Sequence, residues 1–261
     1  YLNKVRAGEW LGNIYGFETI GIAQTQEEMN AHLAHTDQST YLNYSVDGWR
    51  AGDIMYKDID GDGYIRKGST INDLGDLKVI GNDHPRYRIG FNLAATWKWF
   101  DVSAFFQGVC KRDYFINSNN GSGAVGKGAI FWGHTGNMSE SVFFKDHLDY
   151  WRDESSALGA NYDSYYGRLT SDRRNCEYQT RFLQNAAYLR LKNLQVGFTL
   201  PENWLNAIHF KNIRLYFSAE NLVTWTKMTK LIDPETLGVN KMGAGASYPL
   251  SKTMSFGLTA D

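Results

Sequence analysis

The chain has 261 residues, a length that suits one large domain or two small ones, and its 27 basic and 28 acidic side chains give a formal net charge of −1. This balance removes the main electrostatic support for nucleic-acid binding. Aromatic residues make up 15% of the chain, and 26 glycines accompany only 4 prolines, a composition that favours an all-β fold.

The hydropathy, the first residues and the cysteines of the chain further limit the class of protein to which it can belong. No apolar run reaches the roughly 18 residues that a transmembrane helix needs. The first residues, YLNKVRAGEW, lack a basic segment followed by an apolar one, so we do not expect a signal peptide. The chain starts without an initiator methionine, and we expect it to be a fragment of a longer protein. Cys110 and Cys176 permit one disulfide or two unpaired thiols.

The first predicted element is a strand over residues 10–22, where apolar and polar side chains alternate irregularly. It is followed by His32 and His35, which a short helix would place one turn apart. This spacing alone gives weak support for a zinc site.

The next feature is the stretch YKDIDGDGYIRKG, residues 56–68, in which Asp58, Asp60 and Asp62 occupy alternate positions before Gly63. Three carboxylates on one side of a tight turn suit a hard cation such as calcium, and glycine permits the sharp backbone angle. The pattern predicts a structural calcium site, and the alternative is an Asp/Gly-rich turn that binds nothing.

This loop departs from an EF-hand, which requires a bidentate glutamate at loop position twelve. Ser69 holds that position here, and the flanking segments show no amphipathic helical pattern. We therefore expect a partial calcium loop that a later carboxylate closes, either Asp73 or Asp76. The predicted ligand set is Asp58, Asp60, Asp62, Tyr64 and Asp76, with Asp73 as the alternative to Asp76.

Five further segments show the period-two alternation of two-sided strands. They span residues 86–99, 101–109, 187–200, 212–220 and 252–260. In the third, the apolar residues change from odd to even positions near Lys192 and Asn193, which predicts a β-bulge.

The apolar faces of these strands could pack on a second sheet in a soluble sandwich or face lipid in an outer-membrane barrel. The connections separate these alternatives, because they are short at 98–100 and 201–211 and long at 23–85, 111–186 and 222–250. Alternating short and long connections are typical of barrels with short periplasmic turns and long extracellular loops. The pattern therefore predicts an extracellular acidic loop.

The same orientation places Trp97 and Trp99 at the periplasmic end, where barrels carry an aromatic girdle. The polar faces of the strands would then line a wet lumen. The predicted lumen-lining residues are Arg88, Arg190, Lys192 and Arg214.

Six sequence blocks occur in one order: NIYGFETIGIAQTQEEM, GDIMYKDIDGDGYI, VIGNDHPRYRIGFNLAATWKWFDVSAFFQG, YLRLKNLQVGFTLP, NIRLYFSAENLVTWTK and DPE. In this combination they resemble the C-terminal part of SusC/RagA-type TonB-dependent outer-membrane transporters. The resemblance implies that residues 1–261 are the C-terminal portion of a large antiparallel transmembrane β-barrel with long extracellular loops. Barrels of this family have about 22 strands, of which this chain would supply about six. We expect the plug domain and the TonB box of such proteins to be absent from this chain.

The resemblance also implies an integral protein in the outer membrane of a Gram-negative bacterium that imports oligosaccharides or oligopeptides. The implied partners are a SusD-like surface lipoprotein as the lid, the TonB–ExbB–ExbD complex acting through the missing N-terminal part, the glycan or peptide substrate, and outer-membrane lipid. Barrels of this kind usually end in an aromatic residue, so we expect one, Phe, directly after Asp261.

The long connection 111–186 holds the candidate substrate site. Sugars could stack on Trp132 and bond to the amides of Asn119 and Asn120, whereas the alternative is an exposed loop shaped by glycine and asparagine. Trp151 in the same connection is expected to be structural.

No catalytic constellation was found, since the chain lacks G-x-S-x-G, a phosphate-binding glycine loop and CxxC. We therefore expect a transporter rather than an enzyme. Two other hypotheses stay open, namely a soluble all-β glycan-binding or adhesion module with a calcium loop, and a β-rich glycoside hydrolase.

Overall fold

The computed structural model describes residues 8–42, 48–68, 70, 72–115, 145–170, 174–175, 177–208, 210–230, 232–238 and 250–260. The chain divides into two compact units. Unit 1 comprises Tyr1–His84, Asp113–Gln184 and Leu237–Ala246, and unit 2 comprises Pro85–Arg112, Asn185–Thr236 and Ser247–Asp261. Much of the predicted long connections thus belongs to unit 1, whereas the long strands belong to unit 2.

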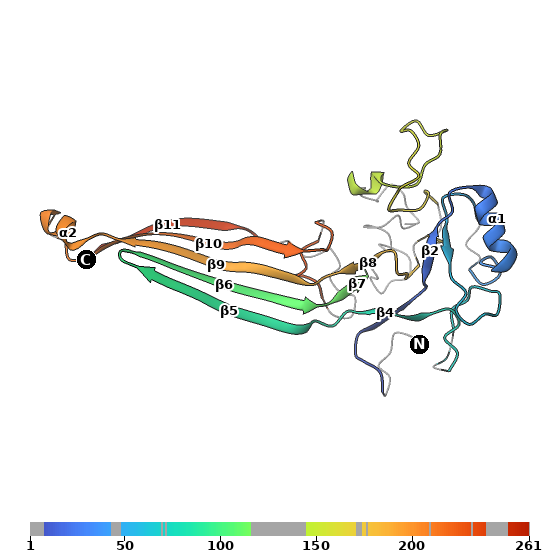
Figure 1. Cartoon of the computed structure of the whole chain (residues 1–261), viewed down its shortest axis with the longest axis horizontal. Coiled ribbons are helices and arrows are strands. Elements are labelled where there is room, and N and C mark those ends of the chain that lie inside the picture. The colour runs from blue at the N-terminus through green and yellow to red at the C-terminus, as the bar shows by residue number, and fades with distance from the viewer. Residues whose placement is uncertain are drawn as a thin grey trace. The chain divides into compact units, whose positions relative to one another are not determined.

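Unit 2 contains a five-stranded antiparallel sheet in the order β11–β10–β9–β6–β5 (Figure 1). The strands are β5 (Arg86–Trp97), β6 (Phe100–Lys111), β9 (Tyr188–Thr199), β10 (Ile213–Thr226) and β11 (Thr253–Ala260). They correspond to the five segments with period-two alternation, so those predictions are confirmed.

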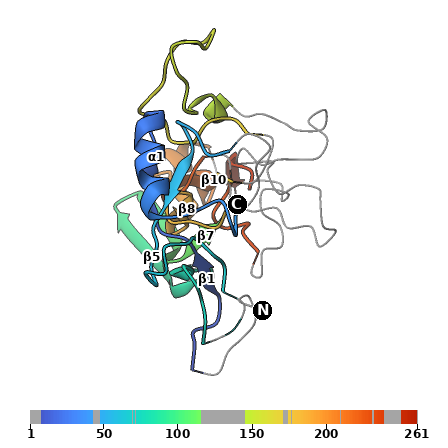
Figure 2. The ribbon, with the colours of Figure 1, turned by 90° about the vertical axis from the view of Figure 1, so that its right-hand side faces the viewer.

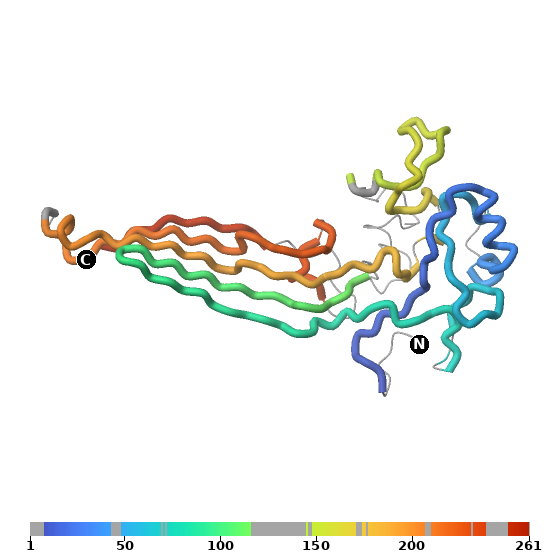
Figure 3. The backbone as a smooth tube through the Cα atoms, in the orientation of Figure 1, coloured from blue at the N-terminus to red at the C-terminus, as the bar shows by residue number. Residues whose placement is uncertain are grey.

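The connection between β5 and β6 is a tight hairpin, whose backbone reversal can be followed in Figure 3. It consists of Lys98 and Trp99, and Lys98 adopts the left-handed conformation with φ of 53°. Two-residue hairpins favour such a conformation because it matches the twist of the strands.

The predicted bulge in β9 is also confirmed. Asn193 lies opposite Phe105 and Leu191 lies opposite Phe106, so Lys192 is the extra residue on its strand. The register with β10 shifts at the same place, between Glu220 and Val223.

The two faces of the sheet differ in chemistry, because residues directly opposite each other in an antiparallel pair share a face. An apolar row crosses all five strands through Ala95, Val102, Val196, Phe217 and Phe256. The neighbouring row on the other face consists of Ala94, Ser103, Gln195, Ser218 and Ser255.

Unit 1 is built from short strands around a core of its own. Its two-stranded sheets pair β1 (Asn13–Gly16) with β4 (Lys78–Asn82), β2 (Thr19–Ile22) with β3 (Ile54–Tyr56), and β7 (Asp113–Phe115) with β8 (Leu183–Asn185). The side chains of Phe17, Ile54, Tyr56, Tyr114 and Phe182 are almost fully buried.

Three helical segments complete the described part of the chain. They are α1 (Gln26–His35), shown in blue in Figure 2, the 3-10 turn η2 (Lys145–Leu148) and α2 (Glu202–Ile208). In the described residues, no helix has both the length and the apolar character that crossing a membrane would require.

The predicted strand over residues 10–22 is wrong as a single element and as a member of the large sheet. It divides into β1 and β2, which pair with different partners. The break occurs at Phe17, whose N–H donates to the Tyr178 carbonyl (2.7 Å) and whose carbonyl accepts from Thr180 (3.0 Å). Because Phe17 pairs with this distant segment and its side chain is buried, the strand cannot continue straight through it.

Candidate functional site

The acidic loop begins directly after β3 and is shaped by Asp58. Its Oδ1 accepts a hydrogen bond from Gly61 N–H (2.7 Å) and its Oδ2 accepts one from Gly63 N–H (2.9 Å). Gly61 and Gly63 have φ of 78° and 82°, a left-handed region that favours glycine. One carboxylate therefore closes the turn, and the glycine spacing allows it.

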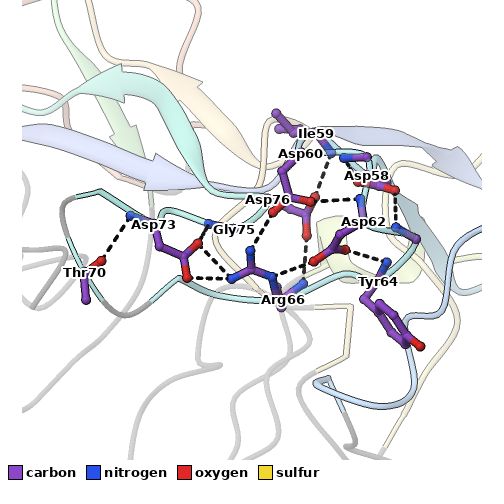
Figure 4. A network of polar contacts seen from close by, with 12 residues as sticks. Asp58, Ile59, Asp60, Asp62, Tyr64, Arg66, Thr70, Asp73, Gly75 and Asp76 are labelled. Carbon is purple, nitrogen blue, oxygen red and sulfur yellow. Dashed lines mark hydrogen bonds and ion pairs between the residues drawn. The ribbon is translucent and has the colours of Figure 1, made fainter.

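Three of the predicted ligand residues come together in the folded chain (Figure 4). One carboxylate oxygen each of Asp58, Asp60 and Asp76 lies within 4.8 Å of the others. Asp76 is fully buried and accepts hydrogen bonds from the N–H groups of Ile59 (2.7 Å) and Arg66 (2.8 Å). Of the two later carboxylates that the sequence left open, Asp76 is the one that joins Asp58 and Asp60.

The electrostatics of this group oppose full ionisation of its buried member. Burial raises the pKa of the Asp76 carboxyl, although its backbone hydrogen bonds act in the opposite direction. The negative charges of Asp60 and Asp58 raise the same pKa further. A positive charge placed among these three carboxylates would relieve both effects.

Arg66 supplies a positive charge at the outer side of the loop, where its side chain contacts Asp60 of this group together with Asp62 and Asp73. Its Nη2 donates to Asp60 Oδ2 (2.8 Å), its Nε donates to Asp62 Oδ2 (2.8 Å), and its Nη1 contacts both oxygens of Asp73 (2.8 and 2.9 Å). Hydrogen bonding to Arg66 lowers the pKa of the Asp62 carboxyl and of the Asp73 carboxyl. The guanidinium therefore binds three carboxylates at once.

The two remaining predicted ligands face other partners. Asp62 Oδ1 accepts from Tyr64 N–H (2.8 Å), and its other oxygen is bonded to Arg66. The Tyr64 ring packs edge-on against Tyr41 at 5.8 Å. Among the described residues, the Asp58–Asp60–Asp76 group is the only set of three acidic, histidine or cysteine side chains with this metal-binding geometry, and His32 and His35 in α1 are not part of it.

Sequence reasoning missed Arg66. Counting from Asp58 as position one, Arg66 occupies position nine of the loop, which calcium loops often use as a ligand through water. That spacing was the available signal, because a cation at a ligand position predicts an internal ion pair.

The four predicted lumen-lining residues share the polar face of the sheet in unit 2. Arg88 lies opposite Val109, which lies opposite Tyr188, and Arg190 lies two residues further along the same face. The Arg214 side chain bonds to Asp101, which projects from the same face, through Nη2 (2.6 Å) and Nε (3.2 Å).

Arg190 is the most enclosed of the four. It donates to Thr224 Oγ1, Glu235 Oε2 and Asp233 Oδ1, each at 2.7 Å. Lys192 also contacts Glu235, at 3.0 Å. The acidic residues of the DPE block therefore neutralise two of the four predicted cations, a role that the sequence did not indicate.

Several predicted residues lie outside the described part of the chain. They are Trp132, Asn119, Asn120 and Cys176, whereas Cys110 is described and exposed. Trp151 is buried, and its Nε1–H donates to Gln24 Oε1 (3.1 Å). This burial agrees with the structural role expected for Trp151.

Comparisons with known proteins find that the chain is similar to TonB-dependent receptors over nearly its whole length, although no family model matches it. TonB-dependent receptor P3 of Formosa agariphila is 28% identical over 97% of this chain. TonB-dependent receptor P26 of the same organism is 25% identical over 98%. The chain spans only 22% and 23% of the length of these relatives.

The fold is similar to that of solved structures. A solved structure of the RagAB peptide transporter matches 95% of this chain and 22% of its own chain, with a TM-score of 0.56 and 22% identity. The RagAB peptide importer in its closed-closed state matches with a TM-score of 0.53 and 23% identity. The resemblance to SusC/RagA-type TonB-dependent receptors is thereby confirmed.

Proposed function

Because this chain resembles SusC/RagA-type TonB-dependent receptors over nearly its whole length, we propose that it forms part of a transmembrane β-barrel in the outer membrane. The barrel would belong to a TonB-dependent importer of oligosaccharides or oligopeptides. In this proposal the chain is a C-terminal portion of the importer and carries no enzymatic activity.

The observation that carries the proposal is the exposure of the apolar face of the sheet in unit 2. Phe256 is 85% exposed, Leu258 63% and Leu93 58%, although all three lie in the middle or second half of regular strands. A soluble domain rarely leaves such a large contiguous apolar surface in water. Lipid is the occupant that suits a face of this kind crossing five neighbouring strands.

Strand length supports the same proposal. β5, β6 and β9 each have 12 residues and β10 has 14, which exceeds the roughly 9–11 residues that a tilted strand needs to cross a bilayer. The edges of the sheet are β5 and β11, so further strands of the whole protein would pair there to close a barrel of about 22 strands.

The orientation and the partners follow from the family resemblance. The connections that form unit 1 would be extracellular, the β5–β6 hairpin with Trp97 and Trp99 would be periplasmic, and the polar sheet face would line the lumen. A SusD-like lipoprotein would cover the extracellular side, and the TonB–ExbB–ExbD complex would supply energy through a part of the protein that precedes this chain.

We further propose that the acidic loop holds a structural calcium ion between Asp58, Asp60 and Asp76. Carboxylate oxygens are the ligands that calcium prefers, and these three lie close enough to share one ion. Tyr64 and water would complete the coordination, with Asp62 in a minor role because its carboxylate is bonded to Arg66 and to Tyr64 N–H. Isothermal titration of the detergent-solubilised whole protein with calcium tests this site, with Asp58→Asn as the loss variant and Asp163→Asn as the control. Equal binding by all three proteins would refute it.

The first experiment for the barrel is membrane fractionation of the full-length gene product, followed by detergent extraction and electrophoresis with and without heating. We expect an outer-membrane protein whose mobility changes on heating, because a closed barrel resists detergent until it is boiled. A freely soluble product would refute the importer and favour the soluble calcium-loop module.

A further inference from the structure

The acidic loop carries a large excess of negative charge, and most of its neighbouring cations are engaged elsewhere. Asp58, Asp60, Asp62, Asp73 and Asp76 all lie in or beside it. The flanking Lys57 pairs with Glu18 (3.6 Å) and Lys67 pairs with Glu177 (2.7 Å). The guanidinium of Arg66 is therefore the cation that the structure places inside the loop.

Arg66 is held in place by its own backbone. Its N–H donates to Asp76 Oδ2 (2.8 Å), and its carbonyl accepts from Asp76 N–H (3.1 Å). The next residues continue this pairing, since Gly68 N–H donates to the Leu74 carbonyl (2.9 Å). The two arms of the loop are thus paired, and the pairing aims the Arg66 side chain at the carboxylates.

The contacts of Arg66 join parts of the loop that would otherwise repel each other. Asp60 and Asp62 stand at positions three and five of the calcium-loop spacing, and Asp73 belongs to the returning arm. In a metal-bound loop, the ion joins such carboxylates. Here a planar guanidinium with its donors in a fixed fork does so, a geometry suited to several carboxylates at once.

Solvent reduces each of these ion pairs but does not remove the network. The Arg66 side chain is 25% exposed, and its three partners are 29%, 36% and 48% exposed. A single exposed ion pair contributes little, whereas several charges that form a network contribute more. We therefore expect the Arg66 ion pairs to stabilise the acidic loop locally, with little effect on the stability of the whole molecule.

We propose that Arg66, at position nine of the acidic loop, is a built-in cation that joins the carboxylates of Asp60, Asp62 and Asp73. In a calcium loop, a metal ion joins the carboxylates in this way. The loop consequently keeps its fold without calcium. Asp62 is committed to Arg66 and contributes little to metal binding, so a calcium ion uses chiefly Asp58, Asp60 and Asp76. Only this last statement rests on the proposed calcium site.

Hydrogen exchange of the full-length protein in detergent, read by mass spectrometry over residues 57–77, tests the inference. With excess EDTA, the wild type is expected to keep slow exchange in this segment, whereas Arg66→Gln is expected to exchange about tenfold faster or more, since charge-assisted contacts are lost. Lys57→Gln removes a neighbouring positive charge that pairs with Glu18 and should exchange like the wild type. Peptides from 188–199 in β9 report whether each variant is folded.

The outcomes separate this inference from the calcium proposal. If calcium restores slow exchange to Arg66→Gln, both are supported. If Arg66→Gln opens and calcium restores nothing, the built-in cation is supported and the calcium site is refuted. The inference is overturned if Arg66→Gln exchanges like the wild type in EDTA, if the wild type opens as far as the variant, or if Lys57→Gln opens equally.

Discussion

Asp53 is the buried carboxylate around which several segments of unit 1 meet. It accepts from Arg50 N–H (2.9 Å), from Asn175 Nδ2 (2.9 Å) and from Arg168 Nη2 (3.0 Å), and it pairs with Arg174 Nη1 (3.3 Å). Both Asp53 and Arg174 are almost fully buried. One side chain thus joins the segment before β3 to residues more than a hundred positions later.

Replacing Asp53 with alanine is expected to destabilise unit 1 by about 3–5 kcal/mol, because Arg174 would keep a buried charge without this partner. Exchange rates of amides in β3 measure the loss. The matched change Asp163→Ala, at an exposed carboxylate, should stay within about 0.5 kcal/mol. Similar effects from both variants would contradict the importance assigned to Asp53.

Because Gly197 has no side chain, it leaves room for the ion pair between Asp101 and Arg214. It lies in β9 between Asp101 on β6 and Tyr216 on β10, and a Cβ there would overlap the Asp101–Arg214 pair. Because a Cβ would displace only the ends of these two partly exposed side chains, we expect Gly197→Ala to weaken the ion pair and destabilise the sheet by about 0.5–1 kcal/mol. The control is Gly90→Ala, where the nearest side-chain atom would be 3.5 Å away. Denaturant midpoints of the heat-modifiable form compare the two, and equal midpoints would contradict the prediction.

Among the elements, helix α1 has a capped N-terminus and a histidine contact near its C-terminus that depends on pH. Thr25 Oγ1 accepts from Glu28 N–H (3.2 Å) and caps the first turn. Near the other end, His32 Nε2 lies 3.1 Å from Gln38 Oε1, which also accepts from Tyr56 N–H (2.6 Å). Because that oxygen is an acceptor, Nε2 is the donor, and the neutral ring suits the site.

Burial lowers the pKa of His32 below its usual 6.5, although the hydrogen bond to Gln38 opposes the shift. The unfolded chain therefore binds a proton more readily, and the stability of this region falls as the pH drops below about 6.5. We expect protection factors in α1 to decrease between about pH 7 and pH 5. His32→Gln should remove most of this dependence, whereas His35→Gln, at an exposed position, should retain it. A pH profile that His32→Gln leaves unchanged would refute the assignment.

At the scale of the whole molecule, the two faces of the large sheet are expected to differ in whether they tolerate a charged side chain. Leu93 lies on the apolar face, opposite Ala104, and the adjacent Asn92 points to the polar face. Leu93→Arg is expected to cost about 2–4 kcal/mol near the middle of a bilayer, whereas Asn92→Arg should be tolerated in a wet lumen. The yield of heat-modifiable protein in the outer membrane measures both. Tolerance of Leu93→Arg would contradict a lipid-facing surface.

The two units differ in how much of their structure could be predicted from the sequence. The long strands and the bulge at Lys192 were predictable because alternation with a period of two is a local property of each strand. Unit 1 was not, because its short strands pair across long connections, as β2 does with β3. The prediction over residues 10–22 failed at Phe17 for this reason.

By itself, the sequence determined the all-β class, the five long strands with their two chemical faces, and the resemblance to a family of transport receptors. Only the tertiary structure decided that Asp76 joins Asp58 and Asp60, that Arg66 binds the carboxylates of Asp60, Asp62 and Asp73, and that the DPE block neutralises Arg190. The physical reason is range: a strand pattern is set by neighbouring residues, whereas these contacts depend on how distant parts of the chain fold back on one another.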